Sequence, residues 1–152
     1  MRKFVFSTVL ILASLPLAAS HAGAHAEYVG GTRADIPTQN NGNIEVMDNT
    51  YFIFLSKKTQ IKIPYDRINL VEYGQKVDRR YLAAAVISPV FMLAKSRRHF
   101  LTLGFQDENG QQQALVFRVD KKDIRVALVS LEARTGQQVR YQDEEARIAG
   151  RG

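Results

Sequence analysis

The chain has 152 residues and carries 21 Lys and Arg against 15 Asp and Glu, which gives a formal net charge of +6. Hydrophobic residues make up 45% and charged residues 24%, a balance typical of one globular domain and not of a disordered chain. There is no cysteine, which excludes a disulfide framework, a thiolate nucleophile and a cysteine-ligated metal site.

Residues 1–26 have the pattern of a secretory signal. Two basic residues precede an apolar run over residues 4–19, and Ala24-His25-Ala26 has the small-x-small pattern of a cleavage site. The run is shorter than the ~20 residues that a membrane-spanning helix needs. We therefore expect export to the periplasm or the extracellular space, with Glu27 as the first mature residue. Two weaker cleavage patterns come earlier: Ala18-Ala19-Ser20 and Ala22-Gly23-Ala24.

Short strand-like segments dominate the chain after the signal. Tyr28-Val29 is expected to form a short edge strand, and a loop rich in turn residues follows it to about Gly42. Alternating and aromatic runs with tight connections then predict a four-stranded antiparallel meander. Its expected strands are Asn43–Met47, Tyr51–Ser56, Thr59–Tyr65 and Arg67–Val77.

A hairpin and a helix are expected in the second half. His99–Phe105 and Gln113–Val119 alternate in hydrophobicity around a turn that contains Gly110. A helix is expected from Lys121 to Thr135, with Asp120 as its N-cap and Gly136 after its end. Four apolar residues at helical spacing should face the sheet: Ile124, Ala127, Leu128 and Leu131.

The sequence leaves the role of a second apolar stripe on the helix open, and it predicts no ordered structure for the last ten residues. Val126, Val129 and Ala133 form a weaker second stripe on the helix, which is either a set of scattered exposed residues or a contact with a partner. A short strand is expected around Val139–Tyr141. Residues 143–152 are highly charged, and we expect them to be disordered, so that one domain spans residues 27–142.

Two phrases of the sequence resemble the pleckstrin-homology superfold, in particular bacterial pleckstrin-homology and GRAM-like domains. Ile61–Gly74 reads IKIPYDRINLVEYG, and residues 100–131 read FLTLGFQDENGQQQALVFRVDKKDIRVALVSL. The chain is also similar to exported bacterial proteins that share the phrases YVGGT, RRHFLTLGF and LEARTG. The resemblance implies a mainly β fold with one C-terminal helix, a pleckstrin-homology-like sandwich or partly open barrel. This superfold hosts lipid, peptide and protein binding.

The sequence is poor in signals of catalysis. The G-x-S-x-G phrase and both Gly-rich phosphate-binding phrases are absent, and His99 is the only histidine after the signal. We therefore expect a protein that is not an enzyme and that uses no cofactor and no metal. A hydrolase is the less favoured alternative, and it requires His99 to lie in a pocket with a serine and a carboxylate.

A charge-free stretch flanked by cations is the most informative part of the chain. Thirteen residues, Leu82 to Ala94, carry no charge, and three cations stand on each side of them within residues 76–98. The stretch is too short to span a bilayer. Three interpretations stay open: it folds back over the core, it dips into a membrane surface where the cations meet anionic headgroups, or it forms an oligomer interface.

These patterns predict a non-catalytic binding module of the cell envelope. Its partner is expected to be an anionic membrane surface or an envelope protein. Nucleic acid is not expected, because only Tyr81 and Phe100 lie near the cations to stack on bases. The alternative is a structural module that forms a homo-oligomer through the same apolar element or a sheet edge. The expected contact residues are Arg79, Arg80, Leu82, Val90, Phe91, Met92, Lys95, Arg97 and Arg98.

Overall fold

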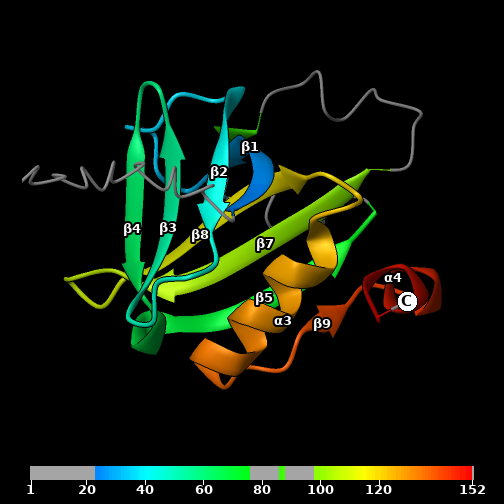
Figure 1. Cartoon of the computed structure of the whole chain (residues 1–152). Coiled ribbons are helices and arrows are strands. Elements are labelled where there is room, and N and C mark those ends of the chain that lie inside the picture. Colours follow the sequence, from blue (N-terminus) through cyan, green and yellow to red (C-terminus); the bar gives the residue numbers. More distant parts are fainter. Residues whose placement is uncertain (1–22, 76–85, 88–97, 152) are drawn as a thin grey trace, which may run out of the picture.

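A single bent β-sheet with two helices forms the protein in the computed structural model, which describes residues 23–75, 86–87 and 98–151 (Figure 1). The strands are β1 (Gly23–Gly31), β2 (Asn40–Glu45), β3 (Tyr51–Ser56), β4 (Gln60–Pro64), β5 (Ile68–Gly74), β6 (Val86–Ile87), β7 (His99–Gln106), β8 (Gln112–Val119) and β9 (Arg140–Tyr141). The helices are the short 3-10 turn η1 (Tyr65–Arg67), α3 (Ile124–Thr135) and α4 (Glu144–Arg151).

The strands follow the order β4-β3-β2-β1-β8-β7-β5-β9, and β6 pairs with β1 beside this path. Neighbouring strands are antiparallel except β5 and β9, which run parallel. In Figure 1, β2, β3 and β4 run upright, whereas β5 and β7 run across the view, so the sheet bends strongly between its two halves. The expected fold class, mainly β with an open sheet and a helix near the C-terminus, is confirmed.

The main core lies on the face of the sheet that α3 covers. Phe117 is fully buried there, and its ring lies 5.6, 5.5 and 5.1 Å from the rings of Tyr28, Phe52 and Phe54. The four expected apolar residues of α3 are all buried against this cluster. The predicted hairpin is confirmed as β7 and β8, and its inward residues belong to the same cluster: Leu101, Leu103, Phe105, Leu115, Phe117 and Val119.

The opposite face of the central strands also has buried residues. Val29, Phe100 and Val116 form a separate small apolar cluster on β1, β7 and β8. On the same face Glu27 and Arg118 stand opposite each other in register and form an ion pair, in which the Glu27 side chain is only 8% exposed. Both faces of the sheet centre are therefore shielded from water.

The first strand differs most from its prediction. Tyr28-Val29 was expected at an edge, but β1 begins at Gly23 and lies at the centre of the sheet, between β2 and β8. The expected meander is also only partly right. β2, β3 and β4 are consecutive neighbours, but β5 does not pair with β4, because η1 turns the chain away and β5 pairs with β7 instead.

The helical regions also depart from the prediction. α3 begins at Ile124 and not at Lys121, and its N-cap residue is Asp123 in place of the expected Asp120; the Asp123 carboxylate accepts the backbone N–H of His25. The tail that we expected to be disordered forms α4. Asp143 accepts the N–H of Ala146 at 2.7 Å and so caps the helix, and Ala146 and Gly150 are buried. A Cβ atom on Gly150 would lie 2.6 Å from Cε1 of Tyr141, so glycine allows this close docking.

Candidate functional site

The predicted contact residues fall almost entirely outside the described part of the chain. Arg98 is described: it is half-buried and directly precedes β7. The other eight lie outside the described residues: Arg79, Arg80, Leu82, Val90, Phe91, Met92, Lys95 and Arg97. For the segment between β5 and β7, the structure therefore gives the positions of its two ends and of the short strand β6 within it.

The two ends of this element belong to neighbouring strands. β5 and β7 are antiparallel, and Gly74 at the end of β5 is paired with Phe100 near the start of β7. The chain between them therefore leaves and re-enters the sheet at the same place. Within it, β6 pairs with Gly30 and Gly31, beyond the point where β2 ends its pairing with β1. Two residues of the charge-free stretch are thus attached to the central strand.

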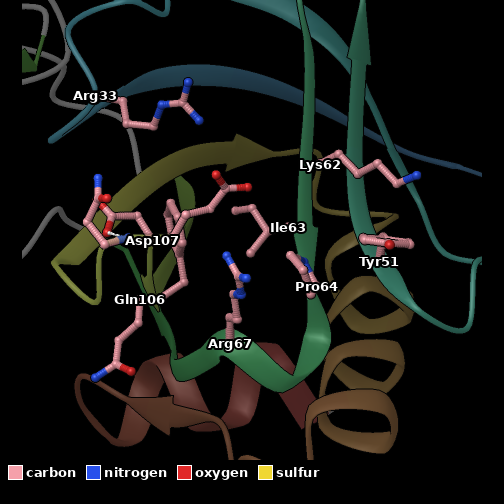
Figure 2. Close-up of a pocket in the computed structure, with 11 residues that line it drawn as sticks. Arg33, Tyr51, Lys62, Ile63, Pro64, Arg67, Gln106 and Asp107 are labelled. Atoms are coloured by element: carbon pink, nitrogen blue, oxygen red, sulfur yellow. Dashed lines mark hydrogen bonds between the residues drawn. The ribbon is translucent and has the colours of Figure 1, made fainter.

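A polar cleft of about 640 Å³ lies at the other end of the sheet, where β4, η1 and the β7–β8 turn meet (Figure 2). Its wall carries three cations and two acids from segments far apart in the sequence. Arg67 points from η1 into the cleft, toward the side where Asp107 lies. The lining residues are Arg33, Tyr51, Lys62, Ile63, Pro64, Arg67, Phe105, Gln106, Asp107, Glu108 and Asn109.

Most of the charges in this cleft already have structural partners. Arg33 makes two hydrogen bonds to the Asp35 carboxylate, and Lys62 lies 3.9 Å above the ring of Tyr51. The Asp107 carboxylate accepts hydrogen bonds from the side chain of Gln113 and from two N–H groups of its own turn. The bond from Gln113 is the main cause of the lowered pKa of Asp107, and the charge of Arg67 contributes less. Asp107 therefore acts as a turn-forming residue, as the sequence predicts.

His99 is held by an aromatic partner. Its Nδ1 shares a hydrogen bond with the hydroxyl of Tyr73, and the two rings are stacked with centroids 5.9 Å apart. Burial lowers the pKa of His99, and the charge of Lys121 adds to the effect. Among the described residues, the hydrogen-bond partner of His99 is Tyr73 and not a serine or a carboxylate.

An apolar groove of about 510 Å³ lies between the β2–β3 connection and the outer side of α3. Met47, Val126 and Val129 are 68%, 56% and 64% exposed at this place. Arg125 and Arg134 are the charged residues that line the groove. The second stripe of α3 is therefore exposed to solvent, as both sequence interpretations require.

The cleft was not predictable from the sequence, because its residues come from four separate segments and form no local motif. Within the described ranges, no group of three or more His, Asp or Glu side chains is placed to hold a metal ion. No helix in that part of the chain is long and apolar enough to cross a membrane. The chain matches no protein-family model and no curated protein.

Proposed function

We propose that this protein is a non-catalytic binding module of the cell envelope that contacts an anionic membrane surface through residues 79–98. One observation carries the proposal. A charge-free stretch of 13 residues lies between two groups of three cations, and both groups are joined to paired strands, β5 and β7. Because Gly74 and Phe100 are paired, the two groups start from the same end of the sheet. Such an arrangement favours contact with one surface by both groups together.

The charges and the apolar residues have separate roles in this proposal. Each Lys or Arg near an anionic membrane surface contributes about 1 kcal/mol, and this attraction weakens as salt is added. The apolar side chains give a contribution that salt does not screen. Exposed charges add little to the stability of a fold, so a purely structural role for this segment predicts that its cations are dispensable.

We expect the purified protein to bind vesicles that contain phosphatidylglycerol more tightly than vesicles of phosphatidylcholine alone. Replacing Arg79, Arg80, Arg97 and Arg98 by glutamine should weaken this binding by on the order of 100-fold or more at low salt, because about 1 kcal/mol is lost per cation. Co-sedimentation with vesicles measures the binding, and thermal unfolding checks that the domain remains folded. Equal binding to both kinds of vesicle would contradict the proposal.

A second variant separates the three interpretations of the apolar stretch. Val90 and Phe91 lie outside β6, so replacing both by serine spares its pairing with β1. On the membrane interpretation, vesicle binding falls and stability is kept. If the stretch covers the core, the domain loses several kcal/mol of stability. If it forms an oligomer interface, the assembly dissociates in sedimentation.

Export is part of the same proposal, and β1 supports an earlier cleavage point than the one expected. Cleavage after Ala26 removes four residues of β1, including the buried Ala24 and Ala26. Cleavage after Ser20 leaves the strand whole. We therefore expect N-terminal sequencing of the protein from an envelope fraction to begin at His21. A sequence that begins at Glu27 would show that the mature sheet lacks the first part of β1, and an intact Met1 would contradict export.

A further inference from the structure

The exposed apolar side chains of the described residues are concentrated at two places. Four large hydrophobic residues are more than half exposed there: Met47, Val126, Val129 and Ile148. The first three line the groove beside α3, whereas Ile148 is 61% exposed on α4. Exposed apolar side chains that gather in one hollow are typical of interaction surfaces.

The charged residues that line the groove are both positive. Arg125 and Arg134 line it, and nine residues of helix separate them, a distance of about 13 Å along the axis. Arg134 is held by Ser130 and Asn49 and lies near Asp48, whereas Arg125 has no hydrogen bond or ion pair to any described residue. A hollow of this kind suits an inserted side chain better than a flat bilayer, and its charge favours acidic neighbours for that side chain.

Helix α4 has the complementary features. Ala146 and Gly150 are buried, and Gly150 lies near Leu128 of α3, so helical geometry directs Ile148 away from the domain. Glu144 and Glu145 precede Ile148 by four and three residues, which places them on the same side of the helix, where Glu144 is ion-paired with Arg147 of its own helix. In Figure 1, α4 lies to one side of α3 and the β2–β3 connection to the other, so α4 does not cover the groove of its own chain.

We propose that α4 of one copy docks into the groove of a second copy. Ile148 inserts between Met47, Val126 and Val129, and the acidic first turn of α4 lies beside Arg125. The two contact surfaces differ, so the association is head-to-tail, and each copy offers one of each surface to further copies. One inserted side chain gives weak association, with a dissociation constant on the order of 100 µM. The proposal does not depend on the proposed membrane contact.

Sedimentation velocity over a range of protein concentrations tests the proposal. We expect the average sedimentation coefficient of the unaltered protein to rise with concentration. Val129→Asp places a charge in the apolar groove, and Ile148→Asp replaces the inserted apolar side chain by a charged one. Each variant alone should remain monomeric. Both residues are more than half exposed, so the domain should stay folded, which thermal unfolding verifies. Gln111→Asp, which introduces the same charge in the exposed β7–β8 turn, is the matched control and should associate like the unaltered protein.

Mixing the two variants gives the decisive result. The Val129→Asp protein keeps Ile148, and the Ile148→Asp protein keeps the groove, so a mixture should form a one-to-one dimer and nothing larger. A mixture that stays monomeric while the unaltered protein associates would overturn the head-to-tail arrangement. Association that persists in either single variant, or an unaltered protein that is monomeric at every concentration, would overturn the proposal as a whole.

Discussion

Replacing Phe117 by alanine is expected to lower the free energy of unfolding by about 3–5 kcal/mol, because the change leaves a cavity at the centre of the core. Phe117 is fully buried and contacts three aromatic rings from β1 and β3. These neighbours belong to paired strands and have little freedom to fill the space. Urea denaturation followed by circular dichroism measures the loss.

Phe117→Leu is the matched control, since it keeps most of the buried volume and should cost less than half as much. A loss under about 1 kcal/mol for the alanine variant would show that the ring is not packed as the structure has it. The same measurement tests whether β8 shares one core with the β2–β4 half of the sheet, because Phe117 lies on β8 and its ring contacts residues of β1 and, beyond β1, of β3.

Replacing Arg118 by alanine is the second change with a large expected effect, about 3 kcal/mol of lost stability. The carboxylate of Glu27 is nearly buried on the outer face of the sheet, and its cross-strand neighbour Arg118 is its ion-pair partner. Without the guanidinium, the carboxylate remains buried with its charge uncompensated. Denaturation at neutral pH measures the difference.

A double variant separates two quantities: the stability lost by leaving the Glu27 carboxylate without a partner, and the stability that the ion pair contributes. When Glu27→Gln is added to Arg118→Ala, no charge remains at this position, and a large part of the lost stability should return. Equal stability of the single and double variants would show that Glu27 is solvated in the absence of Arg118, contrary to its burial in the structure. Arg140→Ala, at an exposed position on β9, is the control and should change stability by under about 0.5 kcal/mol.

The hairpin and the buried side of α3 were predictable because their signals are local. The hydrophobic alternation of the hairpin strands is complete within eight residues, and the apolar spacing of α3 is complete within twelve. Gly110 and Gly136 do adopt positive φ angles, of 74° and 68°. The central place of β1 was not predictable in this way. Its partner β8 lies about ninety residues further along the chain, and Ala24 and Ala26 fit a cleavage pattern as well as they fit a tightly packed strand.

The sequence did not predict helix α4, because its average composition is polar and few of its residues are apolar. Ala146 and Gly150 are its buried residues, and neither is strongly hydrophobic. The cap was nevertheless visible: Asp143 stands before two glutamates, the usual order of charges at a helix start. One side of the groove was predicted, because the stripe on α3 is visible in the sequence. The other side was not, because Met47 comes from a loop whose position depends on the whole sheet.

The position of β1 has a consequence for the order in which the chain acquires structure. Ala26 is paired with Val119, and 93 residues separate them, so the central ladder forms only after most of the polypeptide is available. Contacts this distant in sequence slow folding, because a long loop must close before they contribute. In a nascent chain β1 can therefore pair only with β2 and β6, and its other edge stays open until β8 has been synthesised.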